Sequence, residues 1–332
     1  MSSSSTKRRA SAAELHALTA RAFGPGGQLT SAVELTEGSY NAVYAVTVDD
    51  RPLVLKISPP PGLKLLTHEV DLLRTEVEYY RRAGPAGTPV PEVVYADHDR
   101  SVIECDFMFM SRVDGVPLNG AGLAGSVLAD LRRRITTIAC RAHRVTGTRF
   151  GYPQRGSRTW QTTWRGAFGA MIDDVLADAA RLGSTLPAPP DRIAALLRRH
   201  ADALDEVRRP ALVHFDLWDG NVFVTPSASG GWEVAGLIDG ERAFYGDPLA
   251  ELVSLALLRD LPDAPEVLAG YTDAHGTEVD LDGAEGRRIT LYTSYLYLIM
   301  AIEGATRGWA GPEQEEREAG IRGLLDAQLA RL

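Results

Sequence analysis

Residues 211–239 constrain the fold of this chain more than any other stretch. They contain two apolar runs of strand-like composition, 222–225 and 232–238, joined by a segment rich in Gly, Ser and Pro that can reverse the chain. Two runs with this spacing predict a β-hairpin. If the strands pair, Asn221 at the start of one and Asp239 at the end of the other emerge at the same end of the hairpin. The sequence therefore predicts a site where polar side chains from distant positions meet.

The loop before the hairpin carries groups that could complete such a site. A short apolar run, 211–213, reads as a buried strand and leads directly into this loop. Asn221 and Asp239 offer side-chain oxygens of the kind that Mg²⁺ accepts, and Mg²⁺ leaves most of its positions to water and substrate phosphates. Asp216 precedes Asn221 by five residues and could accept a proton from an attacking hydroxyl. Kinases combine an Asp and an Asn on one loop with a later metal-binding Asp in this way.

Two sequence motifs make this interpretation specific. Residues 214–221, His-Phe-Asp-Leu-Trp-Asp-Gly-Asn, resemble the catalytic loop of the aminoglycoside phosphotransferase and choline-kinase-like family, usually written His-Gly-Asp-x-x-x-x-Asn. Residues 238–241, Ile-Asp-Gly-Glu, are followed by Gly-Asp-Pro at 246–248, and this pair is similar to the family's second motif. Both blocks occur in the family's order and spacing.

Three positions depart from the family pattern. Phe215 stands where the family usually has Gly, Gly240 where an aromatic residue is common, and Glu251 where an Asp is usual. None of these changes removes a chemical group that the mechanism needs, although Phe215 leaves the shape of the loop open. The resemblance further implies that Asp247, in Gly-Asp-Pro, braces the catalytic loop and takes no part in the chemistry.

The resemblance implies an α+β fold of the two-lobed protein-kinase type, with a small antiparallel-β N-lobe and a larger, mainly helical C-lobe. A chain of 332 residues is long enough to bury a large core and to divide into two such lobes. We expect a disordered tail at 1–11, a nucleotide-binding N-lobe at 12–112, and a C-lobe at 113–332 that holds the catalytic loop and the acceptor-binding helices.

Hydrophobic periodicity indicates the elements of both lobes. The expected strands of the N-lobe lie at 33–35, 43–48, 53–57, 93–96 and 107–110. The expected helices lie at 12–23, 67–82, 129–144, 164–182, 191–208, 249–258, 265–274 and 286–309.

Lys56 lies in an apolar run, 53–57, that should be buried. A buried ammonium is costly unless an anion compensates it. By resemblance, this strand lysine holds the α- and β-phosphates of the nucleotide and pairs with a glutamate on the next helix. Glu76 is the favoured partner, because of its distance from the Pro-Val-Pro segment at 89–91, and Glu69 is the second choice. A purely structural salt bridge is the alternative.

Two further segments could contact the nucleotide. Gly38, Ser39 and Asn41 could form a loop whose backbone N–H groups cover the phosphates, although an ordinary hairpin turn would explain the same residues. The stretch around Ser111 and Val113 resembles the family's hinge between lobes, whose backbone groups bond the edge of the purine. Because side chains do not reveal the base, both ATP and GTP stay open as the cofactor used with Mg²⁺.

The sequence says less about the residues that bind the acceptor. His143 resembles a helix-end histidine common in the family, which we interpret as packing. Asp174 and Asp178 lie four residues apart on one helix face, where they could receive ammonium groups of a substrate or simply face solvent. The net charge of −9 argues against nucleic acid as a partner, since phosphate backbones select basic surfaces. It is compatible with a cationic acceptor, and equally with plain solubility.

The cellular setting follows from simple counts. The two cysteines, Cys105 and Cys140, show no metal-type spacing, and a reducing cytoplasmic compartment is the simplest inference. The N-terminus lacks the apolar core of a signal peptide, and the longest late apolar run, 291–302, is too short to cross a bilayer. We expect a cytoplasmic monomer or homodimer without membrane or nucleic-acid partners.

We therefore expect an ATP- or GTP-dependent O-phosphotransferase that moves the γ-phosphate to a hydroxyl of a small molecule. Lys56 would hold the phosphates, and Asp216 would orient and deprotonate the hydroxyl. Asn221 and Asp239 would carry Mg²⁺.

The family resemblance leaves more than one acceptor open. In length the chain resembles the family's antibiotic-modifying members, so an aminoglycoside, peptide or nucleoside antibiotic, inactivated to give resistance, is the first choice of acceptor. A metabolic kinase for choline, an amino sugar, a fructosamine or homoserine is the alternative. A nucleotide-binding pseudokinase is a third interpretation, opposed by the presence of all four of these side chains.

Overall fold

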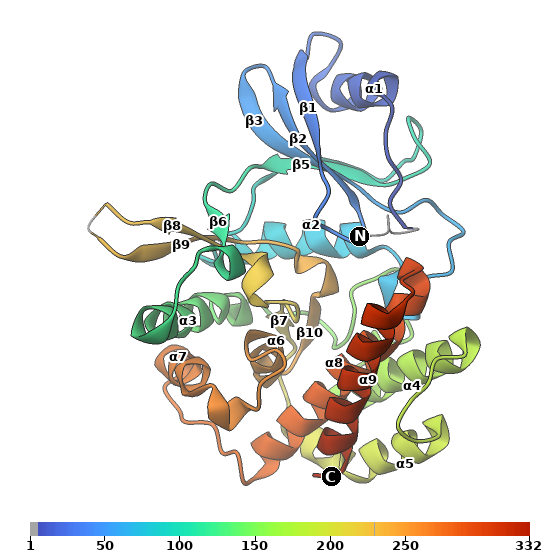
Figure 1. Cartoon of the computed structure of the whole chain (residues 1–332), viewed down its shortest axis with the longest axis vertical. Helices are drawn as coiled ribbons and strands as arrows, with labels where there is room; N and C mark the ends of the chain where they lie inside the picture. The colour runs from blue at the N-terminus through green and yellow to red at the C-terminus, as the bar shows by residue number, and fades with distance from the viewer. Residues whose placement is uncertain (1–5, 229) are drawn as a thin grey trace.

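The computed structural model of the chain describes residues 6–228 and 230–332. Figure 1 shows a β-sheet with two helices at one end of the molecule and most of the helices at the other end. This arrangement confirms the expected kinase-like fold, with an antiparallel sheet in the N-terminal region and a mainly helical C-terminal part.

Antiparallel strands form the N-terminal sheet in the order β1-β2-β3-β5-β4. They are β1 Leu29–Leu35, β2 Ala42–Val48, β3 Arg51–Ile57, β4 Val93–Asp97 and β5 Phe107–Ser111. Alternate residues of a strand face opposite sides, and here each side carries its own helix. The face with Leu55 packs on α1 (Ala12–Phe23), and the face with Val54 packs on α2 (Leu72–Ala83). Lys56 lies two residues after Val54 on β3, so its side chain is on the same face and points toward α2.

The helix expected at 67–82 is interrupted near its start. A 3₁₀ turn, η1 (Thr67–Glu69), precedes α2, and Asp71 between them takes a φ of +59°. The buried Glu69 carboxylate pairs with Arg307, far along the chain. Glu69 is thereby tied to the C-terminal part, and α2 begins only after the break.

Helices dominate the C-terminal part. They are α3 Gly125–Ala139, α4 Trp164–Leu182, α5 Pro190–Arg199, α6 Glu251–Leu255, α7 Pro265–His275, α8 Ala284–Arg307 and α9 Pro312–Leu329. The buried α8 lies against α4, α6 and α9, and α3 packs along α7.

The predicted helix ends agree with the structure to different degrees. The helix at 164–182 is confirmed at both ends. The helix predicted at 129–144 begins four residues earlier and ends at Ala139, and those at 191–208 and 249–258 are shorter, with 3₁₀ turns beside all three. The helix α9 was not predicted. Within the described part of the chain, no helix combines the length and apolarity needed to span a membrane.

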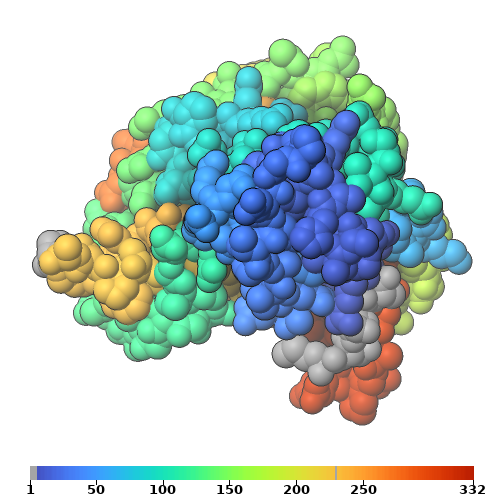
Figure 2. All heavy atoms as spheres, turned by 90° about the horizontal axis from the view of Figure 1, so that it is seen from above, coloured from blue at the N-terminus to red at the C-terminus, as the bar shows by residue number. Residues whose placement is uncertain are grey.

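Short strands surround the loop at 214–221. β7 (Ala211–Val213) pairs with β10 (Phe244–Gly246), and β8 (Val222–Pro226) pairs with β9 (Trp232–Leu237) and with β6 (Val116–Pro117). The predicted β8–β9 hairpin is confirmed, and it projects from the body of the molecule in both views (Figure 1, Figure 2). β6 and β10 were not predicted.

Residues 6–11, part of the expected disordered tail, make defined contacts. The Thr6 hydroxyl donates to the backbone oxygen of Ser39 at 2.9 Å. Ser11 opens α1 through a reciprocal capping box. These residues pack against the loop between β1 and β2, and the remainder of the expected tail, 1–5, lies outside the described residues.

Candidate active site

Lys56 lies at the centre of a buried cluster of carboxylates. Its Nζ is 2.7 Å from a Glu76 oxygen and 3.2 Å from a Glu241 oxygen, and it also pairs with Asp239. The Lys56 side chain is only 4% exposed. Burial disfavours the charged amine, but the three carboxylates outweigh it and raise the pKa of Lys56 well above its usual value. Lys56 is therefore cationic.

Of the two glutamates that could partner Lys56, the structure places Glu76 beside it. Glu69 is held by the C-terminal part, as described above. Tyr80, one turn after Glu76 on α2, donates to a Glu76 oxygen at 2.7 Å and accepts the backbone N–H of Asp239 at 2.9 Å. The helix α2 thus positions both Lys56 and the segment that carries Asp239.

The Lys56 cluster contains more negative than positive groups. Glu76, Asp239 and Glu241 each have a carboxylate oxygen within 4.8 Å of the other two, and all three contact the one ammonium of Lys56. Burial raises the pKa of Glu76 to about 7, with Lys56 opposing the shift and the other carboxylates adding to it. At Asp239 the attraction of Lys56 outweighs burial and lowers the pKa. A further cation would be stabilised beside these carboxylates.

The residue after Asp239 shapes the turn in which it lies. Asp239 adopts a left-handed φ of +62°, and Gly240 is so close to Tyr79 that an added Cβ would lie 2.4 Å from the ring. Tyr79 comes from α2 and packs edge-on against His214, with ring centroids 4.9 Å apart. The Tyr79 ring therefore occupies the space that a side chain at 240 would need, which explains why Gly replaces the family's common aromatic residue there.

Asn41 reaches the Lys56 cluster from the loop between β1 and β2. Its Nδ2 donates to Glu241 Oε2 at 2.6 Å, and both side chains are buried. Its Oδ1 has no hydrogen-bond partner in the described part of the chain. Gly38 and Ser39 lie in the same loop, exposed and half-buried respectively. Glu241 had no predicted role, and its position two residues after Asp239 was the only signal.

Asp216 and Asn221 are joined within the catalytic loop. Asn221 Nδ2 donates to the Asp216 backbone oxygen at 2.8 Å and lies 3.4 Å from Asp216 Oδ2. The Ile238 N–H donates to the Asn221 backbone oxygen at 2.9 Å. The hairpin therefore brings Asn221 beside the segment that carries Asp239, as predicted from the sequence.

The surroundings of the Asp216 carboxyl raise its pKa toward neutral pH. Its side chain is 26% exposed, and Arg242 lies 3.8 Å away. Burial raises the pKa of Asp216 to about 7 against the attraction of Arg242, and neighbouring carboxylates, including Asp239, add to the rise. A base is most effective when its pKa lies near the working pH.

Glu251, and not Asp247, holds the catalytic loop. The buried Glu251 carboxylate accepts the backbone N–H of His214 at 2.8 Å and that of Phe215 at 3.0 Å. The Asp247 carboxylate, which we expected to brace this loop, instead accepts from Arg288 at 2.9 Å and so ties the turn before α6 to α8. A charged acceptor shared by two buried N–H groups is a strong brace.

His214 links the loop to the strand end that precedes Asp239. Its Nε2 lies 2.9 Å from the backbone oxygen of Ile238, which only accepts, so Nε2 is the donor. Its Nδ1 accepts the N–H of Asp216 at 3.2 Å. Burial lowers the pKa of His214 and keeps the ring neutral, as this pair of bonds requires.

Phe215 adopts a backbone conformation that favours glycine. Its φ is +65°, and its ring is buried against Phe244 and Tyr295, with centroids 5.0 and 5.8 Å apart. Burial of the ring therefore holds the backbone in a conformation that the family's usual Gly adopts without strain.

The expected hinge lies at the end of β5. The Ser111 N–H donates to the Glu92 backbone oxygen at 2.9 Å, so this N–H is already bonded within the protein. Val113 packs against Gly236 on β9, where an added Cβ would lie 2.9 Å from the Val113 side chain. The segment 111–113 thus runs from the N-terminal sheet to the β8–β9 hairpin.

The acidic face expected on α4 is already paired. Asp174 binds Arg158 at 2.5 Å, and Asp178 accepts the Thr67 N–H at 2.6 Å and pairs with Arg181 at 2.6 Å. Neither carboxylate is presented to a substrate as a free group.

Comparison with known proteins decides the family. A model of the phosphotransferase enzyme family matches residues 31–288, which include Lys56, Asp216 and Asp239. The chain belongs to this family. Among curated proteins, acyl-CoA dehydrogenase family member 10 of Mus musculus is 27% identical to this chain over 277 residues, covering 78% of this chain and 24% of that protein. The chain thus spans about a quarter of the length of that relative.

Solved structures share the fold of this chain along nearly its whole length. A ternary complex of aminoglycoside phosphotransferase APH(4)-Ia with AMP-PNP and hygromycin B has a TM-score of 0.63 and 19% identity, covering 96% of this chain and 98% of that one. A candidate aminoglycoside phosphotransferase from Ralstonia eutropha has a TM-score of 0.65 and 15% identity, covering 97% and 98%. A candidate fructosamine-3-kinase from Haemophilus somnus has a TM-score of 0.61 and 14% identity, covering 94% and 96%.

Proposed function

We propose that this protein moves the γ-phosphate of ATP or GTP to a hydroxyl of a small molecule. The observation that carries the proposal is the meeting of two groups of residues. Lys56, Glu76 and Asp239 form one buried ionic cluster, and the hairpin sets Asp216 and Asn221 beside the segment that carries Asp239. Phosphoryl transfer needs this combination of positioning and charge, and little covalent chemistry from the protein.

Asn221 and Asp239 are the residues that would hold Mg²⁺. Their amide and carboxylate oxygens are hard donors of the kind Mg²⁺ prefers. The excess of carboxylates around Lys56 supports the assignment, because three carboxylates contact its one ammonium. When bound, Mg²⁺ neutralises charge on the phosphates.

Lys56 would hold the α- and β-phosphates. Its three carboxylate contacts keep it charged and oriented, and phosphate oxygens would replace part of them. The loop with Gly38, Ser39 and Asn41 would cover the phosphates, and backbone groups in 111–113 would bond the purine. The functional lobes would then be 12–112 and 113–332.

Asp216 would orient the acceptor hydroxyl and take its proton. Its raised pKa favours proton transfer near neutral pH, and its link to Asn221 fixes it relative to the metal ligands. Glu251 contributes by holding the backbone of the loop and is a positioning residue.

An antibiotic is the acceptor that we favour, with resistance as the result. The solved complex with hygromycin B and AMP-PNP, matched over nearly its whole chain, supports this choice. A metabolic acceptor of the fructosamine type is the second candidate, supported by the similar fold of the Haemophilus somnus protein. The free thiols of Cys105 and Cys140 fit a reaction in the reducing cytoplasm.

Mass spectrometry of an acceptor panel tests the proposal. Antibiotics and small metabolic alcohols are incubated with the protein, Mg²⁺ and ATP or GTP, and each compound is examined for the mass of an added phosphoryl group. We expect one class of compounds to gain this mass. Asp216→Asn should abolish the gain, because it removes the base.

A second aspartate in the same loop provides the matched control. Asp219 pairs with Arg132 at 2.5 Å and is not one of the carboxylates that contact Lys56, so Asp219→Asn should retain transfer. Transfer that persists in a folded Asp216→Asn variant would refute the catalytic assignment. Nucleotide binding without any phosphorylated product across the panel would favour the pseudokinase alternative.

A further inference from the structure

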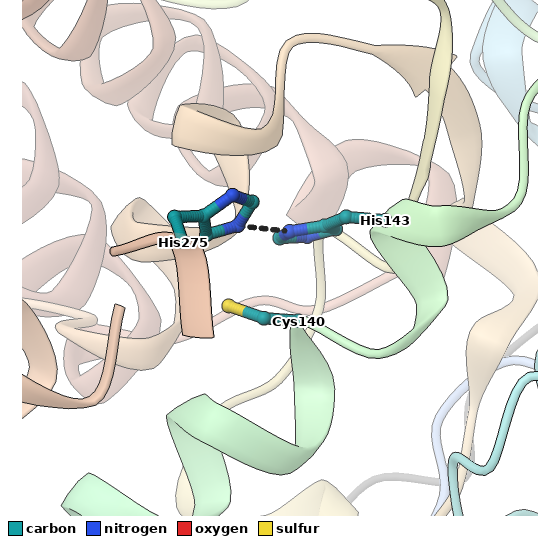
Figure 3. Close-up of side chains that lie close together, drawn as sticks. All are labelled: Cys140, His143 and His275. Atoms are coloured by element: carbon teal, nitrogen blue, oxygen red, sulfur yellow. Dashed lines mark hydrogen bonds between the residues drawn. The ribbon is translucent and has the colours of Figure 1, made fainter. Parts of the chain in front are cut away.

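A second cluster of chemically reactive side chains lies between α3 and α7. Cys140 caps the C-terminal end of α3, His143 follows in the turn η3 (Ala142–Arg144), and His275 is the last residue of α7. A sulfur or nitrogen atom of each lies within 4.8 Å of the other two. Figure 3 shows the two imidazole rings joined by a hydrogen bond, with the Cys140 side chain beside them.

The distance between the two histidine nitrogens is close to that found around a tetrahedral metal ion. His143 Nδ1 and His275 Nε2 are 3.1 Å apart. Two nitrogens that each bind Zn²⁺ at ~2.0–2.1 Å in tetrahedral geometry stand about 3.3–3.4 Å apart, so the two rings would separate by about 0.2–0.3 Å and turn so that both nitrogens point to the ion. A thiolate with two imidazoles is a donor set that zinc-type ions prefer and that Mg²⁺ does not.

The surrounding residues hold these ligands in place. His275 stacks on Tyr271, with ring centroids 4.1 Å apart, and the backbone oxygen of His143 accepts from Arg209 at 2.8 Å. His143 Nε2 lies 3.6 Å from a Glu251 oxygen. Metal-bound histidines commonly direct their second nitrogen to a carboxylate in this way. The positive charge of Arg209 opposes binding of a cation, whereas a Cys140 thiolate and Glu251 favour it.

We propose that Cys140, His143 and His275 form a binding site for a zinc-type divalent cation, with the fourth position open to water. The ion binds the thiolate, so binding releases one proton from Cys140. Each imidazole stays neutral and keeps its one proton on the nitrogen that faces away from the ion. For His143 that nitrogen is Nε2, which faces Glu251.

This site is connected to the catalytic loop through one residue. Glu251, beside His143, accepts the N–H groups of His214 and Phe215. An ion bound to His143 would fix the ring against Glu251 and thereby stiffen the brace of the loop. The site therefore offers the enzyme a structural or regulatory ion that is chemically distinct from the Mg²⁺ of phosphoryl transfer.

Cobalt substitution tests the site in the full chain. We expect Co²⁺ added to the reduced protein to give thiolate-to-cobalt absorption in the near ultraviolet and the visible bands of a tetrahedral site. Zn²⁺ should displace Co²⁺ and remove both features, and Zn²⁺ should raise the Tm of the protein in the absence of nucleotide.

The two buried cysteines provide matched variants. Cys140→Ser should abolish the thiolate absorption, and Cys105→Ser should leave it unchanged. His275→Gln, at a partly exposed position, should weaken the Zn²⁺ affinity by more than the ~10–100-fold that loss of an outer-shell partner causes. Circular dichroism checks that each variant is folded. Absence of the absorption in the unmodified protein, its persistence in Cys140→Ser, or its loss in Cys105→Ser would overturn the proposal.

Discussion

Phe215 allows the strain in the catalytic loop to be measured. The variants Phe215→Gly and Phe215→Ala both delete the ring, but only Gly relieves a backbone with a φ of +65°. The difference in stability between the two variants therefore isolates the backbone contribution from the loss of packing.

The expected magnitudes follow from the burial of Phe215. Its ring is 1% exposed, and deleting a side chain of this kind lowers the free energy of unfolding by ~3–5 kcal/mol. A residue with a Cβ in the left-handed region is destabilised by roughly 1–2 kcal/mol, whereas Gly loses ~0.4–1 kcal/mol through the flexibility of the unfolded chain. The Gly variant should thus be more stable than the Ala variant by about 0.5–1 kcal/mol.

Urea unfolding of the wild type and both variants, followed by circular dichroism, provides the measurement. The order Gly above Ala is the reverse of the order at an ordinary helical or strand position, so its sign alone is informative. An Ala variant at least as stable as the Gly variant, at equal dependence on urea, would show that the backbone at 215 is not strained.

Four further predictions concern the side chains of Asp216, Tyr79 and Glu251. Asp216→Asn should stabilise the fold. The pKa of Asp216 is raised to about 7 in the folded protein, so its ionisation lowers the free energy of unfolding of the wild type as the pH rises from the unfolded pKa of ~3.9 to about 7. In thermal unfolding the gain of the variant should grow over this pH range and then level off, and a gain independent of pH would contradict the prediction. In the active enzyme the same group should make kcat/KM rise with pH to a plateau above about 7. Tyr79→Phe removes a buried hydroxyl that has no hydrogen-bond partner in the described part of the chain, so stability should stay level or rise by ~1 kcal/mol, and a clear loss in thermal unfolding would reveal a partner. Glu251→Gln leaves one acceptor for two buried N–H groups and should lower the free energy of unfolding by ~1–3 kcal/mol and slow phosphoryl transfer, with unchanged turnover as the contrary result.

Local patterns were sufficient to predict much of the fold. The helix at 164–182 begins at a Thr cap and ends at a Gly with a left-handed φ, and both signals are visible in the sequence. The helix at 67–82 breaks at Asp71, whose φ is +59°, and Glu69 just before the break pairs with Arg307. No pattern within the segment indicates a partner so far along the chain. The long α9 was missed for a related reason, because its pattern of apolar residues is weak and its packing partner α8 decides its position.

In the candidate site, too, features with a local sequence signal were predicted and features set by distant contacts were not. Lys56 and the hairpin end were predicted because a strand lysine and a paired turn leave strong local signals. Glu241, the third carboxylate of the cluster, was not predicted, because its contact with Lys56 depends on how the turn after Asp239 folds against Tyr79. That Glu251 holds the loop, and Asp247 does not, likewise depends on tertiary packing.

The claim that the Lys56 cluster binds a Mg²⁺–nucleotide is tested most directly by calorimetric titration of AMP-PNP and its guanine counterpart, with and without Mg²⁺. We predict that Mg²⁺ strengthens nucleotide binding by the unmodified protein, that Asp239→Asn removes this dependence, and that Lys56→Met weakens binding under both conditions. Asp263→Asn, which changes an exposed aspartate elsewhere, should bind as the wild type does. A folded Asp239→Asn variant that retains full Mg²⁺-dependent affinity would contradict the assignment of the site.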